Sequence, residues 1–426
     1  KENYSTAAVS WSGFTEVNKR TSWGFGVRAL VNLTDTKADV LLQEAYLKGK
    51  FGIFELQAGR KKQIQGLADS TLSSGSYIWS GNALPMPMIN LVVNDYWAPK
   101  FVKGVVGFKG NYAHGWFDNQ RSDVADFYLH QKSFYGRLGK PNWLFKFYGG
   151  FNHQVQWGGT LKYADPGNVA AKNGKIATGL KEYLYMITGQ SMNVVGGDTA
   201  KYGINDGWNR LGNHLGSVDV GMEIDWSKAK IFFYRQSVYE DGSLYHGNNI
   251  TDGLHGISFT RKANQGLLKV VLEYLNTSSQ GGNVFNDSNV NRGLDNYFNN
   301  SVYREGWTYL GKGIGTPMMT LDSETDLTAS DQTYFDNNRV EAFYVGIEAK
   351  IGENNLKVRG SLSNAIGWFG EEYVPVKKQY SMGIEWQRPI ELMGYDAQLK
   401  ASLGADKGSW KPNTIGGNIS LLLPLN

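Results

Sequence analysis

Apolar and polar residues alternate with period two through almost the whole chain, and this pattern limits the folds that are open to it. From Val218 to Trp226 every second residue is apolar, and the residues between them include Asp219 and Glu223. Because successive side chains of a strand point to opposite faces, each such run predicts a strand with one apolar and one polar face. The clearest runs are 23–33, 54–60, 143–152, 218–226, 268–274, 356–362, 380–387, 395–403 and 415–423.

Alternation alone fits a soluble β-sandwich as well as a membrane barrel, and the connections between the runs favour the barrel. Short turns at 227–228, 263–265 and 352–354 alternate with longer connections, at 241–252, 281–337 and 369–377. Short turns at one end and long loops at the other are typical of outer-membrane barrels. No apolar run approaches the ~18 residues of a transmembrane helix, but barrel strands do not need one.

We therefore predict an all-β fold, a transmembrane antiparallel β-barrel that residues 1–426 form as one domain. No change of composition and no linker divides the chain. The runs give about 16 strands, or about 18 if 77–83 and 88–97 are both strands. Cys is absent and the net charge is +4 without a basic block, so nothing indicates thiol chemistry or nucleic-acid binding. Because the chain starts with Lys1 and leads straight into a strand pattern, we expect a processed mature chain.

One stretch, residues 67–89, interrupts the alternation. Its serines favour local backbone hydrogen bonds, and its two prolines each remove a backbone donor. We interpret it as a plug segment that folds into the barrel or across one mouth of it. Its polar side chains are more readily explained by satisfying buried backbone groups than by touching a ligand. The residues of this plug motif are Ser73, Ser74, Gly75, Ser76, Gly81, Asn82, Pro85 and Pro87.

Counting strands also assigns the long connections to the two sides of the membrane. By this count residues 160–213 and 281–337 are large extracellular loops, and the plug segment begins on the periplasmic side. Between Gly179 and Gln190 the apolar residues have helical spacing, which predicts a short helix in the first large loop.

Two stretches resemble the outer-membrane capsule-assembly family called Wzi, in the form found in Bacteroidetes-type bacteria. The first comprises residues 72–76 with 81–87, and the second runs from Asn299 to Tyr309 and on to Pro317. The resemblance implies a monomeric barrel of about 18 strands with a plugged lumen, and a surface lectin that holds capsular polysaccharide. The chain departs from common outer-membrane barrels in ending on Leu-Pro-Leu-Asn rather than on an aromatic residue.

No catalytic constellation is evident in the sequence. The six histidines lack metal-ligand spacing, and we expect no metal, no cofactor and no enzymatic activity. Sugar binding is the better-supported chemistry, because pyranose faces stack on aromatic rings while hydroxyls pair with amides and charged groups. The candidate carbohydrate-binding residues lie in the two large loops, although Trp307 and Tyr309 could equally pin the loop inside the barrel mouth. They are Trp208, Tyr303, Arg304, Trp307 and Tyr309.

The sequence thus leads to one preferred function and two alternatives. We expect an integral protein of the bacterial outer membrane that anchors surface polysaccharide or assists its assembly. Its expected partners are that polysaccharide, outer-membrane lipid or lipopolysaccharide, and other envelope proteins, but not nucleic acid. The alternatives are a diffusion porin or substrate channel, and a structural subunit of an outer-membrane complex.

Overall fold

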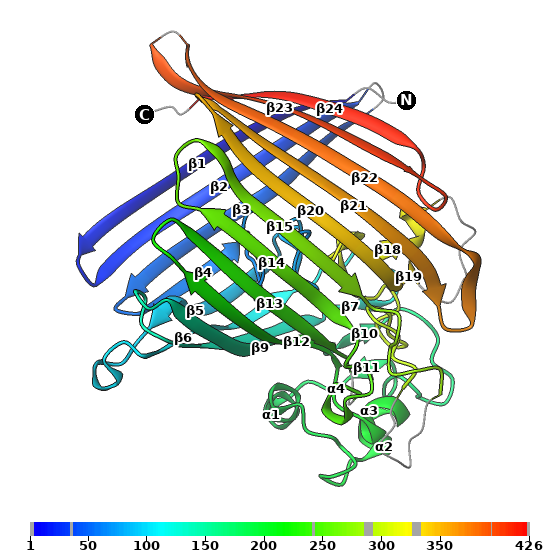
Figure 1. Cartoon of the computed structure of the whole chain (residues 1–426). Helices are drawn as coiled ribbons and strands as arrows, with labels where there is room; N and C mark the ends of the chain where they lie inside the picture. Colours follow the sequence, from blue (N-terminus) through cyan, green and yellow to red (C-terminus); the bar gives the residue numbers. More distant parts are fainter. Residues whose placement is uncertain are drawn as a thin grey trace.

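The computed structural model describes residues 4–34, 37–240, 243–284, 293–325, 334–392 and 394–423. Seventeen antiparallel strands form one sheet in which each strand pairs with the next one along the chain, and the sheet curls into a barrel (Figure 1). Within the described residues no ladder joins β1 to β24. The strands are β1 (Tyr4–Asn18), β2 (Thr21–Thr34), β3 (Ala38–Phe51), β4 (Phe54–Arg60), β5 (Pro87–Trp97), β6 (Val106–Trp116), β8 (Tyr128–Leu138), β9 (Phe145–Trp157), β12 (Asn213–Asp225), β13 (Ala229–Tyr239), β14 (Gly253–Arg261), β15 (Gly266–Asn276), β20 (Arg339–Ile351), β21 (Asn354–Trp368), β22 (Glu371–Leu392), β23 (Tyr395–Gly408) and β24 (Thr414–Leu422).

Smaller elements lie in the connections between these strands. The helix predicted between Gly179 and Gln190 is confirmed as α1. No helix in the described part of the chain is long and apolar enough to cross a membrane. The helices are α1 (Leu180–Thr188), α2 (Thr199–Tyr202), α3 (Ile204–Trp208), α4 (Ser243–His246), η1 (Lys100–Val102) and η2 (Asp322–Glu324). The short strands are β7 (Val124–Ala125), β10 (Gly159–Leu161), β11 (Lys175–Ile176), β16 (Thr308–Tyr309), β17 (Lys312–Gly313), β18 (Thr320–Leu321) and β19 (Phe335–Asn337).

The two ends of the barrel differ in the length of their connections. At one end, which we call the turn end, the connections include 226–228, 262–265 and 352–353. At the other, the loop end, they include 61–86, 158–212 and 277–338. The long connection predicted at 369–377 is wrong: Trp368 pairs with Glu371, so β21 and β22 meet in a tight turn.

The prediction that the plug segment begins at the end opposite the large loops is also wrong. Of the two stretches in doubt, 88–97 forms a strand, as part of β5, and 77–83 does not. The sheet in the described residues therefore has seventeen strands. Because β4 and β5 pair antiparallel, with Arg60 opposite Pro87, the intervening segment leaves and rejoins the sheet at the loop end. Pro87 is tolerated because it is the first residue of its strand.

The predicted alternation describes the two faces of the wall correctly. Val218 and Val220 of β12 are 45 % and 54 % exposed on the outside, whereas Ser217 and Asp219 are fully buried on the inside. The outside of the barrel thus carries a broad band of exposed apolar side chains, while its interior is polar and filled. This arrangement inverts a soluble sandwich and suits a wall that faces lipid.

Candidate functional site

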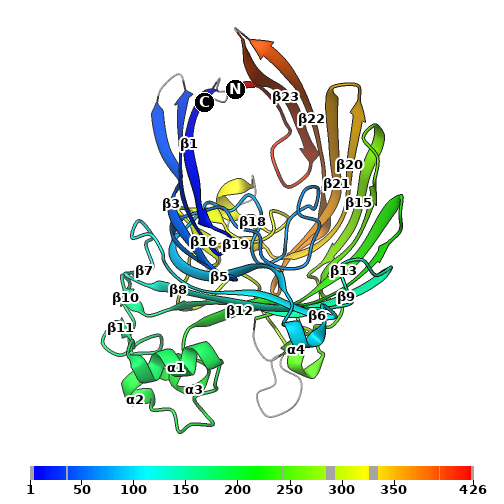
Figure 2. The same ribbon diagram turned by 90° about the vertical axis from the view of Figure 1, so that its left-hand side faces the viewer.

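The barrel interior at the loop end is filled by two chain segments. Figure 2 looks along the barrel from the turn end and shows β16, β18 and β19 inside the ring of strands, with helices α1, α2 and α3 outside it. We call residues 61–86 the first plug segment and residues 295–321 the second. Both contribute to one buried core with inward-facing residues of the wall.

Polar side chains of the wall hold the first plug segment. The Glu273 carboxylate accepts hydrogen bonds from Ser73 Oγ and from the backbone N–H of Ser74, both at 2.6 Å. Gln236 Oε1 accepts from Ser76 Oγ at 3.1 Å and from the N–H of Tyr77 at 2.8 Å. The inward polar residues of the strands therefore pair with a backbone that has no ladder of its own.

The residues of the plug motif differ in their contacts and in their burial. The Ser73 hydroxyl and the backbone N–H of Ser74 donate to Glu273, the Ser76 hydroxyl donates to Gln236, and Gly75 adopts a φ of 123° in the turn between them. The side chain of Asn82 is instead exposed. Gly81 is half-buried, and Pro85 is buried ahead of β5.

The second plug segment is anchored by Trp307. The Trp307 side chain is fully buried, its indole N–H donates to the carbonyl oxygen of Ile78 at 2.8 Å, and its ring lies 6.1 Å from that of Trp79. Tyr303 and Tyr309 are only 1 % and 2 % exposed. These three predicted sugar-binding residues therefore lie beneath the surface, and their placement favours the alternative that they pin the loop.

A buried ion pair ties the second plug segment to the loop between β6 and β8. Arg121 Nη2 lies 2.8 Å from Asp123 Oδ2, and both side chains are almost inaccessible to solvent. Arg121 Nη1 also donates to Thr308 Oγ1 at 2.8 Å and to the carbonyl oxygen of Gly306 at 3.4 Å. Burial alone would raise the pKa of the Asp123 carboxyl, but the Arg121 guanidinium holds it below its usual value. Sequence reasoning missed this pair, which spans only three residues of an irregular loop.

Above the plug, the two large loops enclose a polar pocket of about 450 Å³. The connection 158–212 contributes Asn209 and Arg210, and the connection 277–338 contributes Asn300 and Arg304. Most of the other lining residues also belong to these two connections, and the loop ends of β12 and β21 add Asn213, His214 and Trp368. The lining residues are Asn205, Asn209, Arg210, Gly212, Asn213, His214, Glu240, Gly293, Leu294, Asp295, Asn296, Asn299, Asn300, Ser301, Arg304 and Trp368.

Several of these side chains are held in place by their neighbours. The Arg304 guanidinium lies over the ring of Tyr163, 3.5 Å from its centroid, and Arg210 Nε donates to the carbonyl oxygen of Gly189 at 2.8 Å. Asn300 Oδ1 accepts from the backbone N–H groups of Val302 and Tyr303. The pocket therefore presents fixed amides, two guanidinium groups and one side of an indole, groups that pair with sugar hydroxyls and ring faces.

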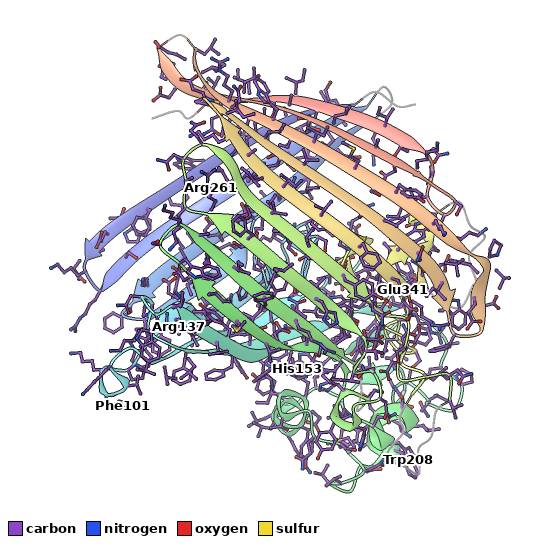
Figure 3. The ribbon with its side chains drawn as sticks, in the orientation of Figure 1. Phe101, Arg137, His153, Trp208, Arg261 and Glu341 are labelled. Atoms are coloured by element: carbon purple, nitrogen blue, oxygen red, sulfur yellow. The ribbon has the colours of Figure 1, made fainter. Side chains whose placement is uncertain are left out.

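Of the predicted sugar-binding residues, Arg304 alone lines this pocket. Trp208 is 59 % exposed and lies at the outer edge of the helices, away from the strands (Figure 3), but it is next to Asn209 in the chain. Sequence reasoning missed Trp368, because its turn falls beside the long connection predicted at 369–377. The sequence did contain a signal for Trp368, because a Trp at the end of a strand is a candidate for a ligand contact.

The described residues contain no group of three or more His, Asp or Glu side chains arranged to hold a metal ion. Next to the pocket, burial raises the pKa of the Asp206 carboxyl in α3 to about 7, although a hydrogen bond from the backbone of Gly212 opposes the shift.

A family of known proteins matches nearly the whole chain. The family model described as capsule assembly protein Wzi matches residues 1–387. The chain belongs to the Wzi capsule assembly family. The resemblance found in the sequence is thus confirmed at the level of the family, and no curated protein matches the chain.

One solved structure supports the fold. Wzi of Escherichia coli, an outer-membrane protein involved in group 1 capsule assembly and a carbohydrate-binding β-barrel, superposes with a TM-score of 0.61 at 14 % identity. The match covers 100 % of this chain and 83 % of that one. OpdL of Pseudomonas aeruginosa gives a TM-score of 0.45 at 8 % identity, covering 99 % of this chain and 95 % of its own.

Proposed function

We propose that this Wzi family member is a non-catalytic outer-membrane barrel that holds surface polysaccharide at the cell, or assists its assembly, through lectin-like binding. The observation that carries the proposal is the loop-end pocket. Residues about 90 positions apart in the sequence, Arg210 and Arg304, come together there with Asn209, Asn300 and Trp368 at the plugged end of the barrel.

The chemistry of the pocket supports a hydroxyl-rich ligand. Planar amides and guanidinium groups donate several hydrogen bonds in fixed directions, and Trp368 offers an apolar face for a sugar ring. The pocket is also too polar to suit an apolar small molecule, whose sites are lined mainly by hydrophobic side chains. The capsule-assembly family and the carbohydrate binding of its Escherichia coli member point to the same ligand class.

The lengths of the connections at the two ends of the barrel support an orientation in which the loop end faces the outside of the cell. Long connections of outer-membrane barrels lie outside the cell and short turns lie in the periplasm. On this basis the residues 160–213 and 281–337 are extracellular, and so is the pocket between them. The exposed apolar band would contact outer-membrane lipid or lipopolysaccharide. Other envelope proteins are further partners under this proposal.

Binding of purified capsular polysaccharide to the purified barrel tests the proposal. Arg304→Ala and Trp368→Ala should each weaken binding about tenfold, equivalent to ~1.4 kcal/mol, because each removes a pocket-lining side chain that is not part of the buried core of the plug. Arg388→Ala is the matched control, since Arg388 is an exposed arginine near the turn end, paired with Glu353. Equal affinity of wild type and both pocket variants would refute the site.

A further inference from the structure

The outer face of the barrel wall changes character near the loop end. Towards the turn end, outward residues such as Phe134 of β8 and Phe151 of β9 are exposed to 48 % and 37 %. The next outward positions on these strands towards the loop end are Lys132 and His153, and His153 is only 7 % exposed. Polar groups therefore occupy positions that elsewhere face lipid, and something covers them.

Four histidines from four neighbouring strands form a row at this level. The rings of His114 and His130, paired across β6 and β8, lie 4.9 Å apart, and His153 Nε2 lies 2.9 Å from His214 Nδ1. His130 is fully buried although it points outward. Figure 3 places His153 between the wall and the helices of the first large loop.

Helix α1 is the element that covers the row. Tyr183 Oη lies 2.7 Å from His114 Nε2, and Lys132 Nζ donates to the carbonyl oxygen of Ile187. Met186 is fully buried in a cluster with Val155 of β9. The helix is thus docked on the outside of the barrel, through the face that carries Tyr183, Met186 and Ile187.

The other flanks of α1 can be assigned from its geometry. Glu182 faces α2, because its carboxylate accepts hydrogen bonds from Lys201 Nζ at 2.6 Å and from Tyr202 Oη at 2.9 Å. At about 100° per residue, Leu180 and Leu184 lie on the flank opposite Glu182. They are 78 % and 51 % exposed.

This flank points along the wall towards its apolar band. In Figure 1, α2 and α3 lie on the loop-end side of α1, so the opposite flank faces the turn end. Figure 1 looks nearly along the axis of α1, whereas Figure 2 shows the helix lengthwise while looking along the barrel. The helix therefore runs across the barrel axis and not along it, as for a helix that lies flat on a membrane.

We infer that α1 is a membrane-surface helix whose Leu180 and Leu184 insert into the lipid leaflet around the loop end of the barrel. Lipid is the occupant because this apolar flank faces the turn end, where the exposed wall around Phe134 and Phe151 must itself be covered by the membrane. Amphipathic helices bind membranes in this way, with their apolar face at the boundary between head groups and acyl chains. The inference rests on the proposed function only in placing the barrel in a membrane.

The absence of Cys from the chain makes a site-specific test direct. Leu184→Cys, and independently Leu180→Cys, would carry a nitroxide in the full-length protein reconstituted into phospholipid vesicles. Phe134→Cys on the barrel wall is the lipid-exposed reference, and Trp208→Cys at the outer edge of the helices is the water-exposed reference. Electron paramagnetic resonance then measures collision with oxygen, which concentrates in lipid, and with a water-soluble nickel chelate.

Labels at 184 and 180 should collide several-fold more with oxygen relative to nickel than the label at 208, and should approach the ratio at 134. A lipid-like ratio at 134 together with water-like ratios at 184 and 180 would overturn the inference and leave the barrel in place. Water-like ratios at all four positions would overturn the membrane placement, and the inference with it.

Discussion

Arg121 shows how a single buried charge can hold a plug segment in place. Its guanidinium joins Asp123 to Thr308 and Gly306, so it connects a loop after β6 to the second plug segment. A buried carboxylate that loses its cation is strongly destabilising, because neither water nor another charge compensates it.

Substituting Arg121 by Met should therefore release the second plug segment. The expected cost is about 3–5 kcal/mol, since Asp123 stays buried without its partner. Limited proteolysis should cut within 295–321 at protease concentrations that leave the wild type intact. Arg388→Met, at an exposed arginine near the turn end, should leave the digestion pattern unchanged. If Arg121→Met is as resistant as the wild type, the ion pair does not anchor the segment.

Gly66 gives a second residue-scale prediction. Its φ is 89°, and a Cβ at this position would lie 2.3 Å from Gln236 Nε2 and 2.6 Å from Ser76 Oγ. Gly66→Ala should lower the unfolding free energy by more than about 1 kcal/mol, measured by thermal melting in detergent. Gly81→Ala is the matched control in the same segment, because a Cβ added there would have no heavy atom of the described residues within 4 Å. Equal melting temperatures for both variants would contradict the packing.

The aromatic residues show where sequence reasoning ends at this scale. Trp307 and Tyr309 stand out in the sequence, but a loop aromatic can either meet a ligand or fill an interior. In a plugged barrel, loop residues can also fill the lumen. The alternation along the strands predicts which strand residues face the lumen, but not which loop residues enter it. The contact of Trp307 with the carbonyl oxygen of Ile78 joins residues 229 positions apart, so no local pattern predicts it.

Among the elements, α3 has a stability that should respond to pH. Burial raises the pKa of Asp206 to about 7, whereas a carboxyl in an unfolded chain titrates near about 4. The folded helix therefore binds a proton more tightly, so stability is greatest below about pH 4 and falls as the pH rises towards about 7. Hydrogen exchange across α2 and α3 should be slower at about pH 5 than at about pH 8 once intrinsic rates are corrected.

Asp206→Asn should remove this pH dependence, since the amide stays neutral. Asp396→Asn, at an exposed position near the turn end, should leave it in place. If the protection from hydrogen exchange depends on pH to the same extent in the wild type and in Asp206→Asn, a group other than Asp206 causes the effect.

At the level of elements, the strands and α1 were predictable because their periodicity is local. The end at which the plug segment begins was not, since it depends on whether 77–83 crosses the barrel. Those residues pack into the lumen instead, where Tyr77, Ile78 and Trp79 are at most 2 % exposed. The pocket could not be predicted as a whole, because it joins two loops with the loop ends of several strands.

For the whole molecule, the two plug segments make a closed lumen the expected state. In a planar bilayer the wild-type protein should show almost no steady conductance. Trp307→Ala should open it intermittently, because removal of a fully buried indole costs about 3–5 kcal/mol of packing. Steady porin-like conductance of the wild type would instead support the channel alternative.

The central claim is that this Wzi family member holds polysaccharide on the cell through its loop-end pocket. The most direct measurement is the division of surface polysaccharide between cells and medium. Four kinds of cell would be compared: cells without the protein, cells with the wild type, cells with the double variant Arg304→Ala and Trp368→Ala, and cells with Arg388→Ala. We expect cells with the wild type or Arg388→Ala to retain the polymer, while cells without the protein and cells with the double variant shed it at unchanged total synthesis. Equal retention in cells that lack the protein would contradict the account.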